Sequence, residues 1–154
     1  HITSNLKHRT SNLELRTSNL EPRTLFMFQR DLDLERQWFR LLGEIERLIG
    51  RKPKDLNGVL FVIGVQELGK GYRPFSKEEK QDLMHIGICR VLSQSGYYEL
   101  AGSDKDGWPH WKMIKKLPHF DLLEQEKLLK MHVVEYFEKE YGLDLTITPS
   151  ENPS

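Results

Sequence analysis

The residues best suited to chemistry in this 154-residue sequence lie together between positions 108 and 119. This segment contains two tryptophans, two histidines and three lysines. Basic side chains interleaved with aromatic rings can stack on bases and pair with phosphates, and tryptophans often dominate the binding energy of protein interfaces. We therefore predict that the segment binds a partner, through the candidate residues Trp108, His110, Trp111, Lys112, Lys115 and Lys116. The alternative is that the tryptophans cover a helical core while the lysines are solvated.

A second set of residues could hold a metal ion or exchange protons, because imidazole and carboxylate groups are common metal ligands. Glu67, His85 and His110 form this set, which is an alternative and not the main prediction. His85 and Cys89 are four residues apart, so they share a helix face. The sequence around them is mostly apolar, which favours packing of the thiol in the core. We predict no catalytic residue, no metal site and no cofactor.

Other patterns lack residues that their chemistry requires. Residues 64–71 match the phosphate-binding pattern G-x-x-x-x-G-K, but glycine replaces the Ser or Thr that would hold Mg²⁺. Residues 102–113, around an Asp-Gly turn, lack the oxygen ligands that begin and end a calcium loop. His132 and Glu135 form one fragment of a di-iron site in reverse order, so we expect them on a solvated helix face.

Four helices are predicted to position these residues, over positions 33–49, 55–68, 77–94 and 121–141. In the first helix apolar residues recur every three or four positions, and Asp33 is suited to cap its start. Residues 55–68 are apolar nearly all round, so a buried strand is the alternative, although the helical spacing favours a helix. Ser76 and Glu79 form a capping-box pattern before the third helix. Gly142 follows the fourth helix, as a glycine commonly does after a last turn.

Between the third and fourth helices, residues 97–117 contain two aromatic runs on either side of a turn rich in Gly and Asp. This pattern predicts a short β-hairpin or an ordered aromatic loop. Pro109 confines the second arm to an edge strand, because proline has no amide hydrogen to donate. Trp108 and Trp111 are three residues apart, so they cannot face the same side of an extended strand. We expect Trp111 to pack on the core and Trp108 to be the more exposed indole.

The N-terminal segment contains a seven-residue repeat, whose copies begin at Thr3, Thr10 and Thr17. Each copy has a single leucine in register, which is too few apolar positions for a coiled coil. We interpret residues 1–26 as a disordered repeat extension outside the native protein, with Met27 as the natural start. The remainder is then one helical domain, residues 27–142, followed by a flexible tail, residues 143–154.

The composition argues against a strongly charged nucleic-acid or lipid binder, a disulfide-bonded protein and a membrane-spanning protein. Basic and acidic side chains number 23 each, so the net charge is zero and gives no general attraction to nucleic acid or anionic lipid. Cys89 is the one cysteine, which excludes an intramolecular disulfide. No apolar run approaches the roughly 18 residues that indicate a membrane-spanning helix. We therefore expect a cytoplasmic protein that does not enter a membrane.

Short phrases of the sequence resemble those of a family of short, uncharacterised bacterial helical proteins, at residues 65–71, 83–89 and 106–111. The resemblance covers the chain from Met27 to about Gly142. It implies a helical bacterial protein and brings no assigned activity, so no functional residue follows from it.

These features predict a mostly α fold, in which about four helices form a compact bundle with one short β-hairpin or ordered aromatic loop. The predicted function is that of a small, non-enzymatic interaction module whose partner is another protein. One alternative is a winged-helix-like nucleic-acid binder, with residues 77–94 as recognition helix and residues 97–113 as wing. The other alternative is a metal-dependent or His/Glu enzyme.

Overall fold

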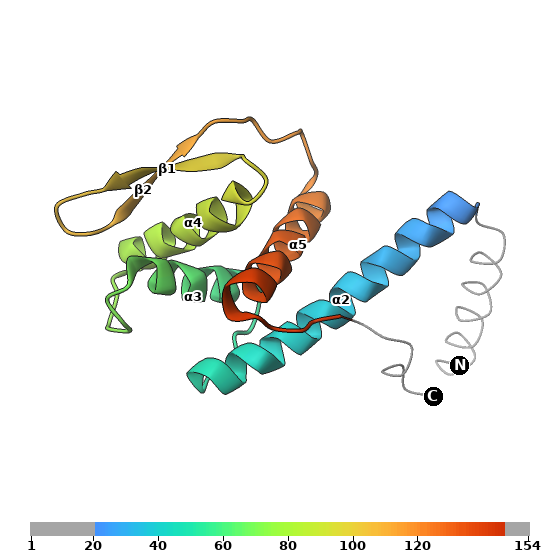
Figure 1. The fold of residues 1–154 in the computed structure, drawn as a ribbon, viewed down its shortest axis with the longest axis horizontal. Coiled ribbons are helices and arrows are strands. Elements are labelled where there is room, and N and C mark those ends of the chain that lie inside the picture. The colour runs from blue at the N-terminus through green and yellow to red at the C-terminus, as the bar shows by residue number, and fades with distance from the viewer. Residues whose placement is uncertain (1–20, 147–154) are drawn as a thin grey trace, which may run out of the picture. The chain divides into compact units, whose positions relative to one another are not determined.

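The computed structural model describes residues 21–146, and within them the fold is mostly α-helical, as predicted (Figure 1). In chain order the elements are α2 (Pro22–Ile49), α3 (Leu56–Leu68), α4 (Lys77–Ser93), β1 (Tyr98–Ser103), β2 (Pro109–Met113) and α5 (Leu122–Tyr141). The chain divides after Arg36, inside α2, into two compact units. The core and the site described below belong to the second unit.

Helix α2 begins at Pro22, well before Asp33, so the prediction that Asp33 caps it is wrong. Asp33 lies inside the helix, where Gln29 donates a hydrogen bond to its carboxylate at 3.3 Å. Proline suits a first turn, because the amide hydrogen that it lacks would have no partner there. Residues 22–26, predicted to be disordered, therefore belong to the helix. Residues 1–20, which carry most of the repeat, lie outside the described residues.

The second and third predicted helices are confirmed, and side chains cap both of them. Residues 56–68 form a helix and not a strand, and the Asp55 carboxylate accepts a hydrogen bond from the amide of Gly58 at 2.9 Å. At the start of α4 the capping box is complete. The amide of Glu79 donates to Ser76 Oγ at 3.1 Å, and the amide of Ser76 donates to the Glu79 carboxylate at 2.9 Å.

Helices α3 and α4 meet backbone against backbone at two glycines. A Cβ atom added to Gly64 would lie 2.0 Å from the carbonyl oxygen of Leu83. A Cβ atom added to Gly87 would lie 2.3 Å from the carbonyl oxygen of Leu60. Only glycine permits such an approach, because every other residue has a Cβ atom. The pair is therefore held at a fixed distance, and α4 presents a defined face to the hairpin.

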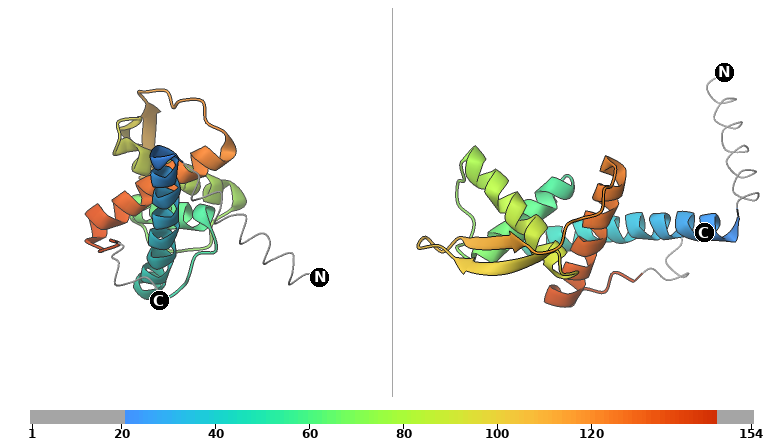
Figure 2. Two further views of the ribbon diagram at one scale, coloured as in Figure 1. Left: turned by 90° about the vertical axis from the view of Figure 1, so that its right-hand side faces the viewer. Right: turned by 90° about the horizontal axis from the view of Figure 1, so that it is seen from above.

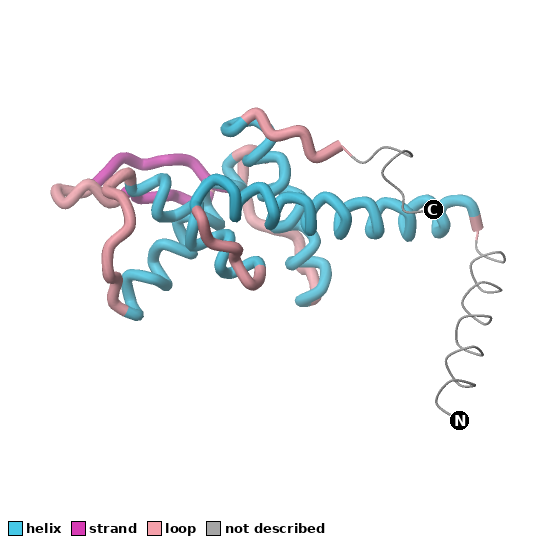
Figure 3. The backbone as a smooth tube through the Cα atoms, turned by 90° about the horizontal axis from the view of Figure 1, so that it is seen from below, coloured by secondary structure: helices cyan, strands magenta, loops and turns pink. Residues whose placement is uncertain are grey.

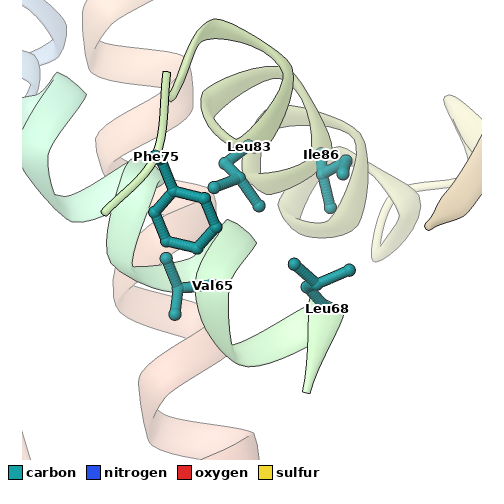
Figure 4. Packing of buried hydrophobic residues seen from close by; sticks show 5 residues of the cluster. All are labelled: Val65, Leu68, Phe75, Leu83 and Ile86. Carbon is teal, nitrogen blue, oxygen red and sulfur yellow. The ribbon is translucent and has the colours of Figure 1, made fainter. Parts of the chain in front are cut away.

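A buried apolar cluster joins α3, α4 and the loop between them (Figure 4). Its members are Val65, Leu68, Phe75, Leu83 and Ile86. The Phe75 ring lies beside Val65 and Leu83, and it meets the Phe61 ring edge-on with centroids 5.9 Å apart. Burying one such side chain contributes about 1.5–3 kcal/mol. The cluster therefore holds the loop and both helices together.

Helix α5 packs on α3 and α4 and is capped at both ends, at its C-terminus by Gly142 as predicted. The Asp121 carboxylate accepts a hydrogen bond from the amide of Glu124 at 2.8 Å. Gly142 ends the helix in the left-handed conformation.

His132 on α5 is buried, so the prediction of a solvated side chain is wrong. Its Nδ1 atom lies 2.7 Å from the carbonyl oxygen of Leu128, and its Nε2 atom lies 2.7 Å from Ser95 Oγ. Spacing along α5 shows which residues share a face, but Ser95 comes from the turn after α4. The prediction failed because that turn is distant in sequence.

The start of the predicted flexible tail is packed within the second unit. Leu145 is fully buried, and Arg40 Nη1 donates to the carbonyl oxygen of Thr146 at 3.4 Å. Apolar burial thus anchors these residues. Residues 147–154 lie outside the described part of the chain.

Strands β1 and β2 form an antiparallel hairpin, which is the one sheet within residues 21–146 (Figure 3). Two views show the hairpin alongside α4 (Figures 1 and 2). Tyr98 pairs with Met113 and Leu100 pairs with Trp111, with a bulge between Leu100 and Gly102. Because side chains alternate along a strand, these four paired residues share one face of the hairpin. Glu99 and Lys112, which pair between them, lie on the opposite face.

Candidate partner-binding groove

A groove with a volume of about 360 Å³ lies between α4 and the hairpin. It is lined by Asp82, His85 and Ile86 from α4 and by Asp104, Trp108, Pro109, His110 and Trp111 from the hairpin. Its volume is near the lower end of the range of about 300–1,000 Å³ for ligand sites. Half of the predicted partner-binding residues therefore meet in one place, together with residues that the sequence analysis did not select.

The α4 wall of the groove follows from helical spacing. Asp82, His85 and Ile86 are three and four residues apart, so they share one side of the helix. Ile86 is buried in the apolar cluster, while Asp82 and His85 are exposed. The His85 ring meets the Tyr98 ring edge-on, with centroids 6.4 Å apart, and this contact links α4 to β1.

The hairpin wall is organised by Asp104. Its Oδ1 atom accepts hydrogen bonds from the amides of Asp106 at 2.9 Å and Trp108 at 3.0 Å. Its Oδ2 atom lies 3.1 Å from His110 Nε2. The amide of Trp108 and the imidazole of His110 lower the pKa of Asp104, so this carboxylate is ionised at neutral pH. One side chain thus shapes the turn and adds a fixed negative charge to the groove.

The structure does not separate the two tryptophans as predicted, because both are partly buried and both line the groove. Trp108 packs against the buried apolar cluster and ties the hairpin to the core, a contact that the prediction assigned to Trp111. Trp111 is half-buried and pairs with Leu100 across the hairpin. The indole nitrogen Nε1 of Trp111 is buried and has no hydrogen-bond partner among the described residues. A buried donor without an acceptor is uncommon in proteins.

Cys89 is buried as predicted, and it supplies no nucleophile to the groove. Its Sγ atom lies 3.5 Å from His85 Nε2. Burial raises the pKa of the thiol to about 11, so the reactive thiolate is scarce at neutral pH. The groove presents imidazoles and carboxylates, and no Ser, Thr, Cys or Lys is among its lining residues.

The predicted lysines do not line the groove. Lys112 lies on the hairpin face opposite Trp111. The Lys115 ammonium group lies over the Tyr97 ring at 4.2 Å from its centroid and donates to the carbonyl oxygen of Ser95. Lys116 is exposed and is not among the lining residues. Lys112 faces away from the groove because side chains alternate along a strand, and Lys115 and Lys116 lie beyond the end of β2.

The alternative metal set is not assembled, because Glu67 lies elsewhere. Glu67 pairs with Arg90 Nε at 3.1 Å and accepts a hydrogen bond from the Tyr136 hydroxyl at 3.3 Å. His85 and His110 both line the groove. Within residues 21–146 no three His, Cys, Asp or Glu side chains are placed to hold a metal ion. The carboxylates that accompany the histidines are Asp82 and Asp104, which helical spacing and the Asp-Gly turn could have identified.

Neither the protein-family models nor the curated proteins nor the solved structures include a significant match to this chain. Among the described helices, none has the length and apolar character that crossing a membrane requires.

Proposed function

We propose that this protein is a non-enzymatic interaction module that binds a segment of a partner protein in the groove between α4 and the hairpin. The observation that carries the proposal is that both hairpin tryptophans line one groove of about 360 Å³. Tryptophan is enriched among the residues that contribute most to binding, where it fills desolvated pockets. A cytoplasmic location and membership of a bacterial family belong to the same proposal.

The hairpin has the rigidity and the apolar surface that such a site needs. Asp104 holds the turn through two amides, and Trp108 fixes the hairpin to the core. A preformed site loses little conformational entropy on binding. Leu100 and Met113, each 52% exposed, share a hairpin face with Trp111 and extend the apolar surface beyond the groove.

A nucleic-acid binder is the second candidate, because two consecutive helices followed by a hairpin resemble the order of elements in a winged helix. The charges count against this candidate. Phosphate contacts need cationic side chains, whereas Asp82 and Asp104 line the groove. The first turn of α4 also carries Glu78 and Glu79, which would repel phosphate.

Selection of peptides from a random display library on the purified protein tests the proposal. Peptides should bind, and Trp111→Ala should weaken them at least tenfold, as expected for a central binding residue. Lys112→Ala is the matched control, since Lys112 is the next residue on the same strand and faces away; its effect should stay within about twofold. Folding of both variants is checked by circular dichroism.

Two results would contradict the proposal. One is a library that yields no binder, and the other is a set of binders that Trp111→Ala leaves unchanged. Tight binding of a DNA or RNA oligonucleotide with a steep dependence on salt would favour the second candidate.

A further inference from the structure

Two carboxylates line the groove, and no lysine or arginine accompanies them. Asp82 and Asp104 stand on opposite walls, and none of the eight lining residues is Lys or Arg. Asp104 is already bonded to His110, but Asp82 makes no hydrogen bond or ion pair within residues 21–146. Lys70, from the loop after α3, donates to the carbonyl oxygen of Asp106 in the hairpin turn. A cationic group from outside would therefore find an unpaired carboxylate beside two indole rings.

The same protein shows what this combination of side chains binds. The Arg90 guanidinium lies over the Tyr136 ring at 5.1 Å, with Glu67 at 3.1 Å from Nε and Glu140 at 2.7 Å from Nη2. A guanidinium can stack flat on an aromatic face while its edge donates to carboxylates, which the compact ammonium of lysine cannot do as well. The groove offers an aromatic surface and two carboxylates from different elements, without the guanidinium.

A second arginine repeats the arrangement on the surface. The Arg73 guanidinium lies over the Phe75 ring at 4.5 Å from its centroid, and its Nη2 atom lies 2.8 Å from the Glu79 carboxylate. Both arginines thus join an aromatic ring to an acid. This pairing is the chemical model for the occupant of the groove.

Taking the proposed function as its basis, we infer that the groove binds an arginine side chain of the partner segment, with the guanidinium beside Trp108 and Trp111 and in contact with Asp82. A volume of about 360 Å³ suits one long side chain with its flanking backbone.

Blocked tripeptides test the inference directly on the full chain. Acetyl-Gly-Arg-Gly-amide is compared with the same peptide containing citrulline, which has nearly the shape of arginine and no charge. Binding is followed by NMR through the indole N–H signals of ¹⁵N-labelled protein. The signals of Trp108 and Trp111 should move on titration, while that of the buried Trp38 should stay in place as an internal reference. The arginine peptide should bind at least about fivefold more tightly than the citrulline peptide, as a partly exposed ion pair would give.

Two single-residue variants test whether the Asp82 carboxylate is the group that binds the guanidinium. Asp82→Asn should weaken the arginine peptide by about five- to tenfold and leave the citrulline peptide unchanged. Glu99→Gln, which removes an equal charge from the opposite hairpin face, should change both affinities by less than about twofold. Equal binding of the two peptides, an unchanged affinity in Asp82→Asn, or no movement of the groove signals would overturn the inference.

The library selection separates this inference from the proposed function. Groove-binding peptides that are rich in arginine support both. Groove-binding peptides without arginine leave the proposed function in place and reject the inference, while a library without binders rejects both.

Discussion

The surroundings of Arg90 and the groove both combine carboxylates with aromatic rings. They differ in whether an arginine or lysine of the chain itself pairs with those carboxylates. Around Arg90, one guanidinium joins Glu67 of α3, Glu140 of α5 and the ring of Tyr136. In the groove, carboxylates and indoles from α4 and the hairpin surround no lysine or arginine. The first region closes contacts between helices, whereas the second leaves Asp82 without a partner among the described residues.

Burial explains why the first region is complete. The Arg90 and Glu67 side chains are only 22% and 26% exposed, and removing one partner would leave the other charge partly desolvated. Burial and the nearby Glu67 carboxylate raise the pKa of Tyr136, so its hydroxyl keeps the proton that it donates to Glu67. Asp82 is exposed and solvated, so it can stay unpaired at small cost.

The largest effect is expected where the groove meets the core. Trp108→Ala should lower the free energy of unfolding by about 3 kcal/mol, and Trp111→Ala by about 1–2 kcal/mol, because only Trp108 packs on the buried cluster. Urea denaturation of both variants measures the difference. A larger loss for Trp111→Ala would make Trp111 the anchor and would remove the distinction between a supporting and a binding tryptophan.

The next largest loss of stability is expected around Arg90. Arg90→Met keeps much of the apolar stem and should lower stability by about 2 kcal/mol, less than for a fully buried pair because water still reaches the site. Arg73→Met is the control: its pair with Glu79 is more exposed, so the loss of stability should be smaller than for Arg90→Met. Equal losses in chemical denaturation would mean that burial does not distinguish the two pairs.

A smaller, pH-dependent effect is expected for Asp104. Its folded-state pKa is lowered, so ionised Asp104 stabilises the protein above its ordinary pKa of about 3.9, and this contribution is lost as pH falls through the lowered value. Asp104→Asn should therefore be less stable than the wild type at pH 7, and the gap should narrow near pH 3. Thermal melts at the two pH values check this, and a gap that widens in acid would contradict it.

The smallest effect is expected for Asp82→Asn. Its melting temperature should match that of the wild type, with stability changed by less than about 0.5 kcal/mol, because Asp82 has no partner within the described residues. Differential scanning calorimetry measures it. A loss as large as that of Arg90→Met would show that Asp82 is structural, and the contrast between the two regions would fail.

Local signals in the sequence predicted most of the elements that build the groove. The Ser76–Glu79 capping box places the start of α4, and the Gly- and Asp-rich turn places the hairpin. Each of these signals acts over a few residues, through one side chain and nearby amides. The same local spacing sets Asp82 and His85 on one side of α4.

Contacts between residues that are distant in sequence decided which side chains come together in each region. Glu67 belongs with Arg90 and Tyr136, which lies 69 positions away, and not with the histidines. The sequence by itself determined which side chains share a helix face or a strand face. Only the tertiary structure decided which faces meet, because that choice depends on the burial of apolar surface contributed by several elements at once. The groove therefore unites Asp82 of α4 with Trp111 of β2, while Lys112, one residue further along the chain, lies on the other side of the hairpin.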